Sequence, residues 1–400
     1  MIFSNGRLIF ADGIRDGLEV VVEKGKITAI RPPAPRLRRK VSRAGRRTGE
    51  YGDAGANEVL DLNGNFLAPG LIDLHVHGAL GRDSMEASAE AFQTICDYHA
   101  TGGTTSLLLT TATAPIDRIA DVLNAARDYR RSIKQLAGVH VEGPFISNAK
   151  CGAQRAEFIQ DPSNALVQKM VDHAEMIKRI TIAPELPGAL EAIEKFHTHR
   201  ISVSGGHSDA WDEQAREGFA RGMNSVTHTF NCMSSARRRG IYRVGGLLEF
   251  ALSEPRISCE LIADGHHVSE TLMRMLYRAK GSGGICLVTD AIAGAGLPDG
   301  SQFSLFGRDC VVEGGVCLLA DRSALAGSAS RMIDLVRTMT TQVNVPLHEA
   351  IMMATENPAR AIGLEGKGCL KINADADLVV LSPDLEVLRT FNSGQEVFSS

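Results

Sequence analysis

The sequence has no long apolar run, no closely spaced cysteine pair and little net charge. Its apolar stretches stay well short of the ~20 residues that span a bilayer, so no membrane segment is expected. The N-terminal apolar stretch is interrupted by Asn5, Gly6 and Arg7, which argues against a signal peptide. The eight cysteines include no C-x-x-C pair, which is typical of reduced thiols. These features together predict a soluble cytoplasmic protein. Because the net charge is only -4 in 400 residues, we expect no nucleic-acid or membrane partner.

The two ends of the chain share one pattern, in which β-branched and polar residues alternate over short stretches separated by glycine turns. We expect strands in residues 1–68 and 369–400 to pair into one small β-sandwich domain. Residues 32–58 are rich in Arg, Gly and Pro without apolar periodicity, which predicts a flexible basic loop. Such a run can bind nucleic acid or anionic lipid, but it is more often a solvated loop.

Between the two ends, residues 69–368 repeat one unit. A short apolar run ending in a polar residue precedes a helical stretch with apolar residues at i, i+3 and i+4. Eight such units predict an α/β fold, a parallel (β/α)8 TIM-type barrel. The runs are "LIDLHVH", "TSLLLTT", "AGVHVEG", "ITIAPE", "ISVSGGH", "SVTHTF", "ISCELIADG" and "GICLVTDA".

Polar residues close these runs, and active sites in such barrels form at the C-terminal ends of the strands. The candidate functional residues are therefore His75, His77, Thr110, Thr111, Glu142, Glu185, His207, His228, Asp264 and Asp290.

The first run carries polar residues at alternate positions, Asp73, His75 and His77. Alternate side chains of a strand share a face, so we expect these three at the barrel mouth. Two neutral imidazoles two residues apart can converge on one metal ion, although two hydrogen-bonded structural histidines would give the same pattern. The side chains on the opposite face of this strand are expected to point toward the helix layer. They are Ile72, Leu74 and Val76.

Later runs add a carboxylate and two imidazoles, Glu142, His207 and His228, which together form the ligand set of a catalytic zinc with an open position. Each has a structural alternative by itself, such as a paired acid or a buried core histidine. Asp290 ends the last run, where it can accept a proton from a metal-activated water and return it to a leaving group. The alternative that Asp290 serves solely as a metal ligand also stays open. The pattern predicts metal-assisted hydrolysis.

These motifs resemble the amidohydrolase superfamily and, within it, the N-acetylglucosamine-6-phosphate deacetylases. The fourth run has no lysine, whereas dihydroorotases and hydantoinases carry a carboxylated lysine there, and Glu142 on the third strand matches the deacetylases. The resemblance covers nearly the whole chain, through "SNGRLIF", "LAPGLIDLHVHG", "GVHVEGPF", "GGHSDA", "VTHTFNCM", "LIADGHHV", "LVTDAI", "LAGSASRM", "ATENPARAIGL" and "ADADLVVL".

The resemblance implies one or two divalent ions per chain, with zinc expected first and Fe, Mn or Co as alternatives. Its principal metal ligands would be Glu142, His207 and His228, and a second ion would lie beside Asp290. The ligands of that second ion would be His75 and His77. Attack of metal-bound hydroxide, with Asp290 as general base and acid, would convert N-acetyl-D-glucosamine 6-phosphate to D-glucosamine 6-phosphate and acetate in amino-sugar catabolism.

Substrate contacts follow from the same resemblance. Asn231 and the backbone N–H of Cys232 match a turn that usually has alanine at the second position, and His267 matches a substrate-contacting histidine. Gln154 stands where relatives often have histidine. Arg239 aligns with an arginine that reaches the phosphate across a homodimer interface, although the residues after it differ and Arg237 or Arg238 could serve instead.

Two further hypotheses stay open. The departures at Gln154 and after Arg239 fit a deacetylase for another N-acyl hexosamine, such as N-acetylgalactosamine 6-phosphate or an unphosphorylated sugar. A catalytically inactive barrel kept for assembly or binding is disfavoured, because every ligand position and Asp290 are retained.

Overall fold

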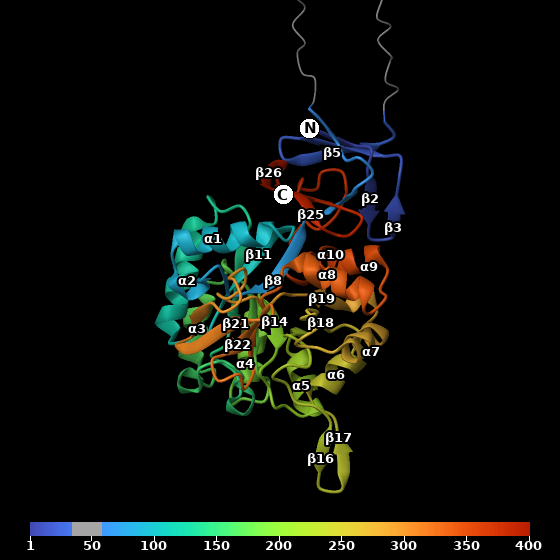
Figure 1. The fold of residues 1–400 in the computed structure, drawn as a ribbon. Coiled ribbons are helices and arrows are strands. Elements are labelled where there is room, and N and C mark those ends of the chain that lie inside the picture. The colour runs from blue at the N-terminus through green and yellow to red at the C-terminus, as the bar shows by residue number, and fades with distance from the viewer. Residues whose placement is uncertain (34–57) are drawn as a thin grey trace, which may run out of the picture.

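The structure is a computed structural model that describes residues 1–33 and 58–400. It contains a parallel barrel and, at one end of the barrel, a β domain built from both ends of the chain (Figure 1). The predicted fold class is therefore confirmed. The basic loop predicted at residues 32–58 lies almost wholly outside the described residues.

The barrel wall is one eight-stranded parallel sheet with the order β19-β18-β15-β14-β13-β12-β11-β8. Hydrogen bonds between the C-terminal end of β8 and the residues after β19 close the barrel. The Asp290 N–H donates to the His75 carbonyl at 2.9 Å, and the His77 N–H donates to the Ala291 carbonyl at 2.8 Å. Every strand overlaps one predicted run. The strands are β8 (Leu71–Val76), β11 (Thr104–Thr111), β12 (Leu136–Glu142), β13 (Ile177–Ile182), β14 (Ser202–Gly205), β15 (Met223–Val226), β18 (Ser258–Leu261) and β19 (Ile285–Leu287).

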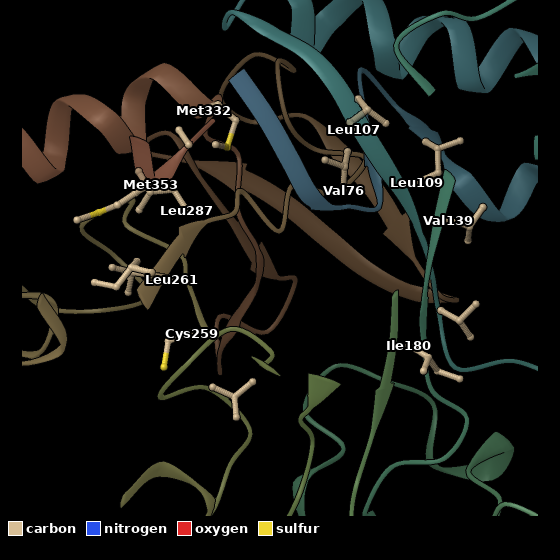
Figure 2. Packing of buried hydrophobic residues seen from close by; sticks show 14 of the residues in the cluster. Val76, Leu107, Leu109, Val139, Ile180, Cys259, Leu261, Leu287, Met332 and Met353 are labelled. Carbon is tan, nitrogen blue, oxygen red and sulfur yellow. The ribbon is translucent and has the colours of Figure 1, made fainter. Parts of the chain in front are cut away.

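Helices cover the outside of the barrel and pack on the aliphatic side chains of the strands. Figure 2 shows this layer, where Leu107, Ile180 and Leu261 come from strands and Met332 and Met353 from α8 and α9. Each fully buried aliphatic side chain of this kind contributes about 1.5–3 kcal/mol. The helices are α1 (Ala89–Ala100), α2 (Ile116–Tyr129), α3 (Asn164–Val171), α4 (Ala189–Thr198), α5 (Asp212–Ala220), α6 (Leu247–Ser253), α7 (Glu270–Lys280), α8 (Met332–Thr341), α9 (Leu347–Met353) and α10 (Glu356–Ala361).

None of these helices has the length and apolar character needed to cross a bilayer, as far as the chain is described.

The β domain has two sheets, with orders β5-β4-β1-β6 and β26-β25-β24-β7-β2-β3. Strands from the two ends of the chain pair directly, because β24 runs antiparallel to β7. The rings of Phe3 and Phe391 meet edge to face at 5.0 Å in its core. The limits predicted for the domains, 1–68, 69–368 and 369–400, stay a prediction. The strands are β1 (Ile2–Ser4), β2 (Arg7–Phe10), β3 (Gly13–Arg15), β4 (Glu19–Glu23), β5 (Lys26–Arg31), β6 (Val59–Asp61), β7 (Phe66–Pro69), β24 (Leu378–Leu381), β25 (Val387–Asn392) and β26 (Gln395–Ser399).

Two segments that extend out of the barrel were not predicted. A hairpin between β15 and α6 projects away from the barrel (Figure 1), and a four-stranded antiparallel sheet, here called the insert, lies between β19 and α8. A shorter pair follows β8. Their strands are β16 (Arg237–Arg239) and β17 (Tyr242–Val244) in the hairpin, β20 (Gln302–Leu305), β21 (Arg308–Glu313), β22 (Val316–Leu319) and β23 (Leu325–Gly327) in the insert, and β9 (Gly78–Ala79) and β10 (Arg82–Asp83) in the pair.

The strict alternation predicted along β8 is wrong. Ile72 and Leu74 pack in one apolar cluster, whereas Val76 packs in the layer under the helices. The register with β11 shifts over the same stretch, as expected for a bulge, which interrupts the alternation of faces. Asp73 does not reach the barrel mouth either, because its carboxylate accepts the Thr289 hydroxyl at 2.5 Å and the Thr289 N–H at 3.2 Å.

Candidate active site and metal centre

The strand ends bring six predicted residues together around the bottom of one cavity of about 450 Å³. Three of the six lie just past a strand and have positive φ angles, +47° at His207, +30° at His228 and +52° at Asp290. Positive φ is rare for residues other than glycine and is typical of strained functional sites. The six residues are His75, His77, Glu142, His207, His228 and Asp290.

The first ligand cluster consists of Glu142, His207 and His228. Glu142 Oε1 lies 3.2 Å from each histidine Nε2, and the two Nε2 atoms are 3.0 Å apart. The His207 Nδ1 lies 2.8 Å from the Lys150 carbonyl oxygen, which only accepts, so Nδ1 holds the proton and the Nε2 lone pair faces the cluster. Four ligands about 2.0–2.1 Å from a tetrahedral ion lie about 3.3 Å from one another. The three atoms therefore fit one metal ion.

The second cluster consists of His75, His77 and Asp290. The two histidine Nε2 atoms are 3.3 Å apart, and Asp290 Oδ1 lies 3.4 Å from His75 and 3.5 Å from His77. Glu142 is shared by both clusters, since its Oε1 is 3.4 Å from His75 and its Oε2 is 3.3 Å from His77. Donor separations in this range fit a second ion, with Glu142 between the two positions.

Glu142 is held both electrostatically and by hydrogen bonds. Burial favours its neutral form, but the neighbouring His75 and His207 outweigh burial and hold the pKa of Glu142 well below its ordinary value. The Gln154 side-chain amide donates to Glu142 Oε2 at 2.6 Å, and its oxygen accepts the Thr113 N–H at 2.7 Å. Gln154 thus orients the shared carboxylate, and its predicted contact with substrate stays a prediction.

Behind the histidines lies a buried network that the sequence did not reveal. Arg179 on β13 and Glu260 on β18 form an ion pair with both side chains 0% exposed. Glu260 Oε2 lies 3.3 Å from His75 Nδ1, and the His140 ring packs edge-on against the His75 ring at 4.5 Å. Burial raises the pKa of Glu260, but Arg179 and His75 outweigh it and lower that pKa below its ordinary value. A carboxylate on the rear nitrogen of a ligand histidine fixes its ring orientation.

Four predicted substrate residues line the cavity, namely Gln154, Asn231, Cys232 and His267. The Asn231 side-chain nitrogen is buried and has no hydrogen-bond partner among the described residues. The His267 Nδ1 pairs with Asp264 Oδ2 at 2.6 Å. The Cys232 thiol lies beside His207, and the residue lines the cavity.

Arg239 lies elsewhere. It sits on β16, pairs with Glu213 and stacks over the Trp211 ring at 4.8 Å from its centroid, outside the cavity of its own chain. Its predicted contact with the site of a neighbouring chain stays a prediction. The insert, in contrast, supplies cavity residues that were not predicted, among them Phe306 and Arg308.

A parallel barrel whose strand ends gather histidines and carboxylates defines a metal-dependent hydrolase. Residues 66–397 match the Amidohydrolase family. The chain is 32% identical over 400 residues to the N-acetylglucosamine-6-phosphate deacetylase of Lysinibacillus sphaericus, covering 99% of this chain and 97% of that one. It is 33% identical over 342 residues to the N-acetylgalactosamine-6-phosphate deacetylase of Escherichia coli O157:H7, covering 84% and 89%.

A solved structure is also similar. It is a mutant N-acetyl-D-glucosamine-6-phosphate deacetylase from Mycobacterium smegmatis in complex with N-acetyl-D-glucosamine-6-phosphate, with a TM-score of 0.88, 28% identity and coverage of 100% of this chain and 99% of that one. The protein therefore belongs to the amidohydrolase family and, within it, to the N-acetylglucosamine-6-phosphate deacetylase family that its motifs predicted. Membership implies a divalent metal, and the donor clusters fit one.

Proposed function

We propose that this protein is an amide hydrolase that converts N-acetyl-D-glucosamine 6-phosphate to D-glucosamine 6-phosphate and acetate. The observation that carries the proposal is the convergence of two donor clusters and Asp290 at one cavity in a chain of this family. A cavity of about 450 Å³ lies within the range of small-molecule sites and suits one sugar phosphate.

The metal would be held by Glu142, His207 and His228, and a second ion by His75 and His77 with Asp290 beside them. When bound, a divalent ion acidifies a water molecule and polarises the acetamide carbonyl. Zinc suits the imidazole and carboxylate donors best, and iron, manganese or cobalt share the same ligand preferences.

Asp290 is placed to move protons. Its backbone is fixed on both sides, because its N–H donates to the His75 carbonyl and its own carbonyl accepts the Ser328 N–H at 3.0 Å. Its side chain is 16% exposed and lines the cavity, unlike the fully buried His75. We assign Asp290 as the catalytic residue that takes a proton from the attacking water and gives it to the amine nitrogen as the C–N bond breaks.

His267 and Asn231 would bind the sugar. Burial lowers the pKa of His267, but Asp264 outweighs it and raises that pKa above its ordinary value, so the ring tends to carry its charge. Because Asp264 holds Nδ1, Nε2 is the atom available to a ligand. The unpartnered Asn231 amide supplies a second donor, since a buried donor without a partner costs about 1–3 kcal/mol until a ligand satisfies it.

The hexosamine epimer is a second question, because the sequence identity to the N-acetylgalactosamine-6-phosphate deacetylase, 33% over 342 residues, is close to the 32% over 400 residues to the glucosamine enzyme. Acetate release should be measured on both 6-phosphates and on both unphosphorylated sugars, with metal-loaded protein. We expect the highest kcat/KM on N-acetyl-D-glucosamine 6-phosphate. A higher value on the galactosamine epimer would favour that activity, and no acetate from any of the four would contradict the proposal.

A homodimer in which Arg239 reaches the neighbouring site is also proposed. Its support is the projecting hairpin, whose tip exposes Ile241 (85%) and Tyr242 (71%), because exposed apolar residues of this size are typical of interfaces. Light scattering of the wild type and of the Tyr242→Ser variant tests it, and a monomeric wild type would contradict it. A cytoplasmic location is proposed as well, in keeping with eight free cysteines.

A further inference from the structure

Glu260 lies behind both donor clusters and does not line the cavity that they face. Its Oε2 atom is 3.3 Å from His75 Nδ1, and the same oxygen accepts the His228 backbone N–H at 3.2 Å. His75 belongs to the second cluster and His228 to the first. One buried carboxylate oxygen therefore contacts a ligand residue of each cluster from the side away from the cavity.

Arg179 holds the other oxygen of this carboxylate. Its guanidinium donates to Glu260 Oε1, and both side chains are 0% exposed. A guanidinium stays protonated in proteins, so the carboxylate paired with it is ionised and can only accept hydrogen bonds. The proton between Glu260 and His75 must then lie on His75 Nδ1. This tautomer leaves the lone pair on His75 Nε2, the atom that faces His77 and Asp290.

The two clusters differ in how the rear nitrogens of their histidines are held. In the first cluster, His207 Nδ1 donates to the Lys150 carbonyl at 2.8 Å, an anchor that does not depend on Glu260. In the second cluster, His77 Nδ1 is buried and has no hydrogen-bond partner among the described residues. His75 is therefore the histidine of the second cluster whose ring is oriented by a hydrogen bond, and Glu260 supplies that bond.

A rival interpretation is that the buried network itself holds an ion. Donor atoms of His75, His140 and Glu260 lie within 4.8 Å of one another. Arg179, however, already places a permanent positive charge on the same carboxylate, which disfavours a cation there. His75 Nδ1 also carries the proton and offers no lone pair on this side. The network is therefore better suited to supporting a ligand than to binding a metal.

We propose that Glu260, held by Arg179, is a positioning residue for metal binding at the second cluster. The proposal rests on the two-ion site of the proposed function. A carboxylate on the rear nitrogen fixes the ring of a ligand histidine and makes it a better donor. Because the first cluster keeps its own anchor at His207, loss of Glu260 should weaken the second ion more than the first. The affinity of the second position would then depend on a residue outside the cavity.

The test is calorimetric titration of Co²⁺ into chelator-treated protein, together with the visible absorption of the bound Co²⁺. Arg179→Met/Glu260→Leu removes both buried charges and the acceptor behind His75. We expect this variant to bind the second ion about 10- to 100-fold more weakly, with a much smaller change for the first ion. Arg179→Met/Glu260→Gln keeps a side-chain oxygen and nearly the native shape, and it should recover part of the loss.

Lys367→Met/Asp377→Asn is the matched control. This pair is also largely buried, with side chains 20% and 2% exposed, but it joins the C-terminal segment to the β domain and contacts none of the metal ligands. The control should bind both ions like the wild type. Far-ultraviolet circular dichroism checks that each variant is folded, and the glutamine variant keeps the test decisive if the leucine variant is not.

The outcomes separate positioning from plain stability. Equal weakening of both ions, unchanged binding of the second ion, or a loss of the second ion in the control as well would each overturn the proposal. A wild type that binds one ion, or three, also contradicts it. If the variants lose the second ion as expected but the wild type releases no acetate, the proposed deacetylation fails and the role of Glu260 stands.

Discussion

Replacing Arg179 by methionine should destabilise the barrel far more than the loss of a surface charge. The Arg179 and Glu260 side chains are both 0% exposed, so neither charge is hydrated by bulk water. Removing the guanidinium leaves the Glu260 carboxylate in the barrel with the His228 N–H at 3.2 Å and the His75 ring at 3.3 Å as its remaining partners. Breaking one side of a buried pair costs about 3–5 kcal/mol.

The remaining partners set the magnitude. Because the carboxylate keeps one backbone donor and one imidazole, we expect the low end of that range, about 3 kcal/mol. The double variant Arg179→Met/Glu260→Gln removes both charges and should regain most of the loss. Unfolding by urea, followed by circular dichroism on chelator-treated protein, measures the effect without the contribution of metal binding through His75.

A surface pair gives the control. Arg221 and Glu194 form an ion pair with side chains 45% and 55% exposed, so Arg221→Met should cost less than about 1 kcal/mol. The reasoning is refuted if Arg179→Met costs no more than Arg221→Met, or if the double variant is no more stable than the single one.

Three further outcomes are expected. Replacing both His75 and His77 by alanine should reduce metal content, measured by elemental analysis, toward one ion per chain, and unchanged content would mean that this pair is structural. Asp290→Asn should keep its metal yet lose about 10²-fold or more in turnover, and full turnover would remove Asp290 from the mechanism. Burial lowers the pKa of His99 to about 4, so the unfolded chain takes up a proton below its ordinary value of 6.5 while the folded chain does not. Stability should therefore fall between pH 6.5 and pH 4 by up to about 1.4 kcal/mol per pH unit, and His99→Leu should flatten this dependence in denaturation midpoints; parallel curves would contradict it.

The barrel was predictable because each unit carried its own local signal. A short apolar run that ends in a polar residue, followed by a 3.6-residue apolar period, admits few topologies once it repeats eight times. The ends of elements were less predictable. The helical pattern from Ser163 extends to Lys178, but α3 ends at Val171, a turn follows, and β13 takes up Ile177 and Lys178. Their apolar spacing fits either element, and only the tertiary pairing decides between them.

The donor clusters were predictable for a related reason. In a parallel barrel, the C-terminal ends of all strands lie at the same end of the barrel. The proximity of residues far apart in the chain, such as Glu142 and His228, can therefore be predicted without knowing the packing. The ion pair between Arg179 and Glu260 could not be predicted. The sequence shows a polar residue inside a strand, but it does not show which other strand that residue faces across the barrel. The position of Arg308 depended on where the insert packs, and a hairpin pattern carries no information about that.

The backbone at the strand ends of this site is strained. His207, His228 and Asp290 hold positive φ angles, a conformation that costs about 1–3 kcal/mol for each residue other than glycine. The Nε2 atoms of the two histidines approach to 3.0 Å, although His207 presents a lone pair there. Both features persist because the surrounding core fixes the strand ends. Because the donors already lie at the spacing of the ligands of one ion, a metal ion would bind the folded chain in preference to the unfolded chain, and metal binding and folding stability should therefore be linked.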